Sequence, residues 1–170
     1  MMRAVRLAAA ALLAVCLSAC STVMVDGDYP HYATAPEMFD RATAVVQARI
    51  GAGEVRDVVI SRETGETSVY TVYTVAVEQA YKGAAAGDTL EIKQAGGRSG
   101  LVTYVDVDVV PLIEGEMYVL FLETYADTPA SPLNPTQAIY RVDATGQLTP
   151  VDPSAPALTH ADLARLAATR

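Results

Sequence analysis

Few side chains in this sequence could take part in chemistry, and they lie far apart along the chain. The histidines are His31 and His160, and the cysteines are Cys16 and Cys20. A serine or cysteine nucleophile needs a histidine held beside it, and a zinc site needs three or four histidine, cysteine or acidic ligands. Neither histidine falls in a segment with a strand pattern, and the two are not paired at ligand spacing. We therefore expect no catalytic residues, no metal site and no cofactor.

Acidic residues form the second candidate group. Asp106 and Asp108 alternate with apolar residues, so we expect them on one face of a strand over residues 101–110, with Glu114 and Glu116 following. Calcium sites usually draw on turn carbonyls in a loop rich in Asp, Asn and Gly, and this segment has no such loop. We interpret the group as a solvent-facing acidic strand. An enzyme or enzyme accessory that uses this acidic face is the alternative function.

The third candidate is the thiol of Cys20. Arg3 and Arg6 precede an apolar run over residues 7–17, which is about eleven residues and too short for a membrane-spanning helix of about twenty. The run closes with Leu-Ser-Ala-Cys at residues 17–20, which resembles the lipobox of bacterial lipoproteins. The resemblance implies that residues 1–19 are a cleaved signal peptide and that the Cys20 sulfur carries a diacylglyceryl group.

A lipidated Cys20 predicts an extracytoplasmic protein held on a membrane. One acyl chain binds a bilayer only marginally, whereas two or three chains give a lasting anchor. Because Ser21 follows the cysteine, where inner-membrane lipoproteins often carry Asp, the resemblance implies the outer membrane in a host with two membranes. In other hosts it implies the outer face of the cell membrane. The alternative is an ordinary secretory signal, which leaves Cys20 as a free thiol.

The charge of the chain limits its partners. The sequence has 12 Lys and Arg against 20 Asp and Glu, and loss of residues 1–19 removes Arg3 and Arg6, which leaves a net charge of about −10. Nucleic acid requires a positively charged surface, so we expect no nucleic-acid partner. We expect the membrane, through Cys20, and an envelope protein or polymer as partners.

Behind the signal peptide, the pattern predicts one domain with a helix near each end. Residues 20–35 have no sustained period and suit a lipidated cysteine followed by a flexible tether. Residues 36–152 form the expected β domain, and residues 153–170 the C-terminal helix and tail. Capping patterns at Thr34 with Glu37, and at Thr159 with Asp162, predict where the two helices begin.

Strand patterns fill most of the domain. They cover residues 44–50, 55–61, 67–81, 89–94, 101–110, 117–122, 137–143 and 147–151. The longest has Tyr73, Val75 and Val77 on its expected core face and needs a bend or bulge, while residues 117–122 are apolar on both faces and so predict a central strand. The predicted fold is mainly β, a small antiparallel OB-like β-barrel or a sandwich.

Two structural motifs carry a family resemblance. Tyr-Lys-Gly at residues 81–83 ends one strand, and Gly-Glu-Met-Tyr-Val-Leu-Phe-Leu at residues 115–122 begins another. The pattern is similar to poorly characterised bacterial exported domains, which resemble the OB-fold barrels of netrin-like and tissue-inhibitor-of-metalloproteinase domains. That resemblance implies a fold more than a function. Inhibition through a free N-terminal cysteine does not fit, because Cys20 is predicted to be lipidated.

Two loops are candidate contact segments. Residues 96–100 include Gly96, Gly97, Arg98 and Ser99, and lead into a strand rather than a helix, so we expect a hairpin turn and not a phosphate loop. Residues 126–135 hold three prolines and are expected to be a loop. Tyr70, Tyr104 and Tyr118 could line a shallow binding face. We expect a lipid-anchored binding or structural module.

Overall fold

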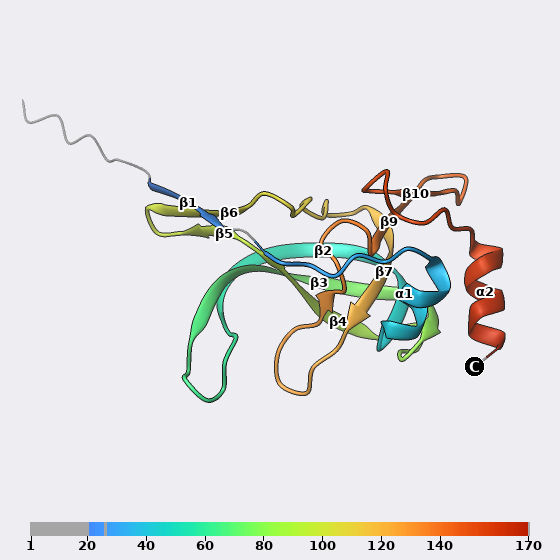
Figure 1. Ribbon diagram of the computed structural model, residues 1–170, viewed down its shortest axis with the longest axis horizontal. Coiled ribbons are helices and arrows are strands. Elements are labelled where there is room, and N and C mark those ends of the chain that lie inside the picture. Colours follow the sequence, from blue (N-terminus) through green and yellow to red (C-terminus); the bar gives the residue numbers. More distant parts are fainter. Residues whose placement is uncertain (1–20, 26, 170) are drawn as a thin grey trace, which may run out of the picture.

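The computed structural model describes residues 21–25 and 27–169, so Cys20 and the predicted signal peptide lie outside the described residues. The fold is mainly β with two helices, as the sequence predicts (Figure 1). In chain order the elements are β1 (Ser21–Val25), α1 (Ala35–Arg41), β2 (Ala44–Val59), β3 (Thr67–Lys82), β4 (Thr89–Ala95), β5 (Gly97–Ser99), β6 (Val102–Asp106), β7 (Met117–Glu123), β8 (Ser131–Pro132), β9 (Ile139–Val142), β10 (Leu148–Pro150) and α2 (His160–Ala168).

The strands form two sheets, and the arrangement is the sandwich-like alternative rather than a closed barrel. The larger sheet has the order β10-β9-β7-β2-β3-β4, with β8 paired to β7, and the smaller sheet has the order β1-β6-β5. The β4 edge meets the segment before β8 only at an isolated bridge between Ile92 and Ala130. Two backbone hydrogen bonds of 2.8 and 2.9 Å make this bridge. The described sheet is therefore strongly curved, but β4 and the segment before β8 do not form a continuous ladder that would close a barrel.

The long hairpin of β2 and β3 forms most of the curved surface (Figure 1). The sequence pattern predicts two strands here, over residues 44–50 and 55–61, with Gly51 and Gly53 between them. This prediction is wrong, because β2 runs unbroken from Ala44 to Val59. The glycines instead mark a register shift in the pairing between Ile50 and Gly53, as at a β-bulge. A Cβ on Gly51 would come within 2.7 Å of the Thr74 carbonyl oxygen, so the close strand approach favours glycine there.

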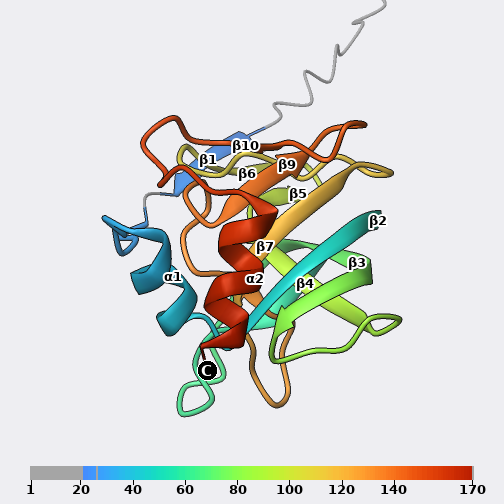
Figure 2. The same ribbon diagram turned by 90° about the vertical axis from the view of Figure 1, so that its right-hand side faces the viewer.

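Strand β7 is central, as its apolar pattern predicts. Val119 and Phe121 pack into one hydrophobic cluster, which also contains Met38 and Phe39 of α1 and Leu163 of α2. The two helices cover this face of the sheet (Figure 2). The opposite side chains of β7 enter a second cluster, whose strand members include Tyr118, Leu120, Val46, Tyr73, Val75, Val77 and Ile92. The predicted core face of β3 is therefore confirmed.

Both predicted helix starts are confirmed. The Thr34 side chain accepts a hydrogen bond of 3.3 Å from the backbone N–H of Glu37 at the start of α1. At α2, the Thr159 side chain accepts from the backbone N–H of Asp162, and the Asp162 carboxylate accepts from the backbone N–H of Thr159 at 3.0 Å. Each cap satisfies helix donors that have no partner within the helix.

The small sheet forms an arm beside the body of the molecule (Figure 1). We expected a flexible tether over residues 20–35, but residues 21–25 form β1, which pairs in parallel with β6. The Ser21 backbone N–H donates to the Leu101 carbonyl oxygen at 3.2 Å, so the described chain begins at the tip of the β5–β6 hairpin. Within the described residues, no helix has the length and hydropathy needed to cross a membrane.

Candidate functional site

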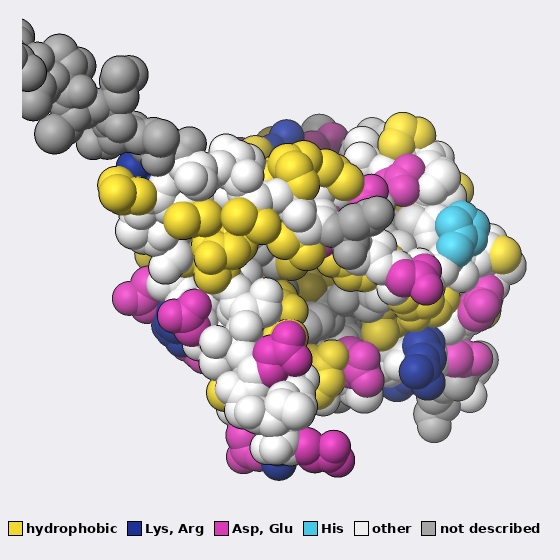
Figure 3. Space-filling view, turned by 60° about the vertical axis from the view of Figure 1, so that its left-hand side comes forward, with side chains coloured by type: hydrophobic (Ala, Val, Ile, Leu, Met, Phe, Trp, Pro, Cys, Tyr) yellow, Lys and Arg dark blue, Asp and Glu magenta, His cyan; other side chains and the backbone are white. Residues whose placement is uncertain are grey.

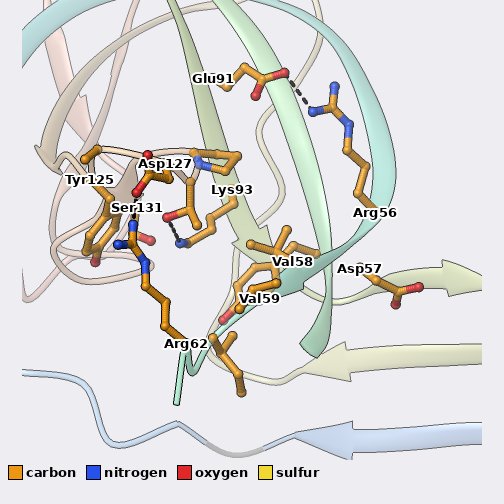
Figure 4. Close-up of a pocket in the computed structure, with 15 residues that line it drawn as sticks. Arg56, Asp57, Val58, Val59, Arg62, Glu91, Lys93, Tyr125, Asp127 and Ser131 are labelled. Carbon is orange, nitrogen blue, oxygen red and sulfur yellow. Dashed lines mark hydrogen bonds and ion pairs between the residues drawn. The ribbon is translucent and has the colours of Figure 1, made fainter. Parts of the chain in front are cut away.

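A cavity lies between the distal half of the β2–β3 hairpin, strand β4 and residues 125–131 (Figure 4). Its volume is about 970 Å³, at the upper end of the range of small-molecule sites. We call it the Lys93 cavity. The described residues that line it are Arg56, Asp57, Val58, Val59, Ile60, Arg62, Tyr70, Glu91, Lys93, Tyr125, Ala126, Asp127, Thr128, Pro129 and Ser131.

The strand alternation puts polar side chains on the cavity face of the sheet. Successive side chains of a strand point to opposite faces, so Ile92 enters the core while Glu91 and Lys93 lie on the other face. Lys93 pairs with Val72 of β3, and Tyr70 lies two residues before Val72, so its side chain points to the same face of the sheet. The second face of the curved sheet therefore brings a lysine and a tyrosine to the same surface.

Lys93 is the most unusual of these residues, because it is charged and, as a residue, only 9 % exposed. Its Nζ lies 4.4 Å from the centre of the Tyr125 ring and 5.7 Å from the centre of the Tyr70 ring. It donates one long hydrogen bond, of 3.3 Å, to the Thr128 hydroxyl. Burial lowers the pKa of the Lys93 ammonium group, and the negative charge of Glu123 partly opposes this effect.

Ion pairs lie on two sides of the cavity. Arg56 donates to Glu91 at 2.7 Å, and Arg62 of the β2–β3 turn pairs with Asp127 of the facing segment (Figure 4). The side chains of Arg62 and Asp127 are 70 % and 66 % exposed, so their pairing contributes little to stability. Its structural effect is to connect two segments that border the opening.

The predicted contact segment at Gly96, Gly97, Arg98 and Ser99 is not a simple turn. Gly97–Ser99 is strand β5 and pairs with β6, and the turn follows at Gly100, which has a φ of 60°. Gly96 is fixed to the β3 strand, because the Thr71 hydroxyl donates to the Gly96 carbonyl oxygen at 3.0 Å. The structure thus places this segment on the arm, outside the lining of the Lys93 cavity.

The predicted acidic face of Asp106 and Asp108 is also corrected by the structure. Strand β6 ends at Asp106, and Asp108 follows in a turn, so the two carboxylates do not share a strand face. Asp106 is only 4 % exposed and accepts a hydrogen bond of 2.5 Å from the Tyr29 hydroxyl. Burial and this bond raise the pKa of Tyr29. Asp106 braces the segment after β1 against the arm, which explains its acidic side chain without catalysis.

The other candidate residues are dispersed. Tyr70 lines the Lys93 cavity, but Tyr118 is a core residue and Tyr104 lines a separate hollow of about 210 Å³ on the arm side. His160 bonds to the Tyr81 hydroxyl at 2.7 Å, and His31 is exposed. Within the part of the chain that the structure describes, no group of His, Cys, Asp and Glu side chains is arranged to hold a metal ion.

Lys93 is a site residue that the sequence pattern does not predict. Part of the predicted loop at residues 126–135 does line the cavity, but nothing in its prolines and small residues identified the opposing lysine. One signal was present in the composition. Lys82 and Lys93 are the only lysines of an acidic sequence, and Lys93 falls at a polar position of the alternation over residues 89–93.

The comparisons with known proteins add no identity. No protein-family model matches the chain, and no curated protein matches it significantly. The lipobox and OB-fold resemblances therefore stay predictions from the sequence, and the function has to be argued from the geometry of the cavity.

Proposed function

We propose that this chain is a lipid-anchored extracytoplasmic envelope protein that acts as a binding module, with the Lys93 cavity as its binding site. The partner is an envelope protein or polymer. The observation that carries the binding proposal is Lys93, a charged residue of the cavity lining that is only 9 % exposed and whose ammonium group makes one long hydrogen bond. A buried charge is costly unless it is paired, so a group of this kind indicates a site whose partner is a ligand.

The arm supports the anchoring part of the proposal. The described chain begins at Ser21, one residue after the predicted lipidation site, and Ser21 pairs with Val102 beside the turn that joins β5 to β6. Several apolar side chains of the arm and the turn after it are exposed, and Figure 3 shows hydrophobic side chains gathered on this face. The exposed residues include Val23, Met24, Leu101, Val105 and Val107. An anchor at Cys20 would bring this apolar surface close to lipid.

The anchoring part is tested by expressing the full chain in a bacterial host and measuring the mass of the mature protein. We expect cleavage before Cys20 and the added mass of the lipid. The Cys20→Ala variant should lack that mass and leave the membrane fraction. A mature wild-type chain without added acyl mass would contradict the anchor.

The binding part is tested by sedimentation of the purified mature protein with an envelope fraction from the same host. We expect Lys93→Met to reduce the retained fraction at least tenfold. Arg165→Gln is the matched control, because it removes one positive charge from the exposed face of α2, away from the cavity. Protease treatment of the envelope fraction distinguishes a protein partner from a polymer. Equal retention of Lys93→Met and wild type would disprove binding at the cavity.

A further inference from the structure

The hydrogen bonds of Lys93 are incomplete. A lysine ammonium group has three N–H donors, and the described residues provide Nζ with one hydrogen-bond acceptor, the Thr128 hydroxyl. The rings of Tyr70 and Tyr125 stabilise the positive charge through their faces, but they do not neutralise it. The ion pairs around the cavity all involve arginines. Within the described residues, no carboxylate lies within ion-pair distance of the Lys93 Nζ.

The nearby acidic residues are already engaged or point elsewhere. Glu91 pairs with Arg56 and Asp127 pairs with Arg62, while the Asp57 side chain points away from Lys93 (Figure 4). Glu123 forms no ion pair with Lys93, although its negative charge partly opposes the lowering of the Lys93 pKa. The cavity therefore presents one cation without a carboxylate partner, and a negatively charged ligand group would complete it.

The surroundings favour a carboxylate over a phosphate. Phosphate sites usually combine several cations with a helix N-terminus or a glycine-rich loop, and neither α1 nor α2 nor a glycine contributes to the cavity lining. Arg56 and Arg62 are committed to ion pairs. The net charge of the chain is also negative, which disfavours polyanions.

The rest of the lining describes the body of the ligand. Apolar and aromatic groups from Val58, Tyr70, Tyr125 and Pro129 share the cavity with Lys93. Flat rings contact such walls well, and tyrosine supplies a large contact area at a small loss of conformational freedom. We propose that the cavity binds an organic monocarboxylate with a ring or apolar body, with Lys93 paired to the carboxylate and the two tyrosines against the body. This inference rests on the proposed function, because it identifies the ligand class of the same cavity.

Benzoate is a suitable probe, with benzamide as its uncharged counterpart of the same shape. The protein is labelled with ¹³C-lysine, which gives signals from Lys82 and Lys93 alone. We expect benzoate to shift the Lys93 signal saturably, with Lys82 unmoved, and benzamide to bind at least tenfold more weakly. Lys93→Gln and Tyr125→Ala, each checked for a native spectrum, should both weaken benzoate binding. Inorganic phosphate at equal concentration should cause no saturable shift.

Three results would overturn the inference. Benzamide could bind as well as benzoate, phosphate could bind more tightly, or the Lys93 signal could stay unmoved at saturating benzoate. The sedimentation experiment separates this failure from failure of the proposed function. If Lys93→Met loses envelope retention while benzoate does not bind, the cavity is a binding site and the ligand class is wrong. If benzoate binds through Lys93 but retention is unchanged, the ligand class stands and the envelope-binding function is wrong.

Discussion

The two lysines of this chain lie in opposite kinds of environment. Lys82 ends β3, and its Nζ donates to the carbonyl oxygens of Phe39 and Asp40 at 2.8 and 3.0 Å. These carbonyls belong to the last turn of α1, where the helix dipole favours a positive charge. Lys93 has one long bond to a hydroxyl and two aromatic neighbours. Within the described residues, one ammonium group thus has two carbonyl acceptors and the other a single hydroxyl.

The difference separates a structural cation from a candidate binding cation. A helix carbonyl that accepts a charged donor is satisfied in the folded protein, so Lys82 should contribute to stability. A buried ammonium group with incomplete hydrogen bonding should contribute little to stability or oppose it, and should gain from a ligand. Substitutions at Lys82 and Lys93 should therefore change the free energy of unfolding by different amounts or in opposite directions.

The largest effect is expected next to Lys82, at Gly83. Gly83 has a φ of 65°, and a Cβ there would come within 1.9 Å of the Thr43 carbonyl oxygen. Gly83→Ala combines this backbone clash with left-handed strain, and we expect a loss of about 3 kcal/mol in the free energy of unfolding. Urea denaturation measures it. Gly65→Ala is the control, since its φ is similar and no atom lies within 4 Å of the added Cβ. Equal losses at both glycines would show that conformation alone, without the close approach, explains the effect.

The next effect is expected from Lys82→Met, which keeps the apolar stem and removes the charged donor. Two carbonyls at the end of α1 lose their charge-assisted bonds, and we expect a loss of about 2 kcal/mol in unfolding free energy. Lys82→Arg should recover part of it. If Lys82→Met unfolds at the wild-type urea concentration, Lys82 has no structural role and the comparison fails.

Lys93→Met should have a smaller effect, of the opposite sign or near zero. Methionine fills a similar volume with no charge to desolvate, so we expect the unfolding free energy to rise by about 1 kcal/mol or to stay unchanged. The cavity should remain, because its other lining residues come from β2, β3 and residues 125–131. A loss as large as that of Lys82→Met would show that Lys93 is structural, and would remove the main support for the binding site.

The sequence predicted the elements that depend on local patterns. Alternation identified the core face of β3, and capping pairs placed the starts of α1 and α2, because both signals lie within a few residues of one another. Gly51 misled the prediction because a glycine in a strand reads as a break, although here it permits a bulge in a continuous β2. Whether the glycine ends the strand or forms a bulge depends on the close approach of Thr74 in the neighbouring strand, which the local pattern cannot reveal.

The site depended on longer-range pairing, and so it was not predicted. Lys93 and Tyr70 are brought onto one face by the register of β3 with β4, and Thr128 arrives from a segment that follows β7. Likewise, Asp106 alternates like a solvent-facing residue until Tyr29 is placed over it. Only the fold shows that Asp106 is bonded to Tyr29 and that Lys93, among the described residues, has no ion-pair partner.

The smallest effect concerns pH and tests the charge of Lys93 directly. Burial lowers the pKa of Lys93 from its ordinary value of 10.5. Below the lowered pKa, Lys93 carries its proton in both the folded and the unfolded state, so the cost of burying the charge is fully present. As the pH rises through the lowered pKa toward 10.5, the folded state loses the proton first, and the wild type gains stability relative to Lys93→Met. Burial raises the pKa of Tyr70 and Tyr125. Both tyrosines are present in the variant as well, so they do not distinguish the two proteins.

Urea denaturation of wild type and Lys93→Met at several pH values from 7 to 10 measures this difference. We expect the free energy of unfolding of the wild type to rise steadily relative to that of Lys93→Met as the pH rises, since deprotonation relieves the cost of burying the charge. If the difference in unfolding free energy between wild type and Lys93→Met is constant over this range, Lys93 retains its proton as readily when folded as when unfolded. A saturating carboxylate should produce this constant difference, because it pairs with the protonated Lys93.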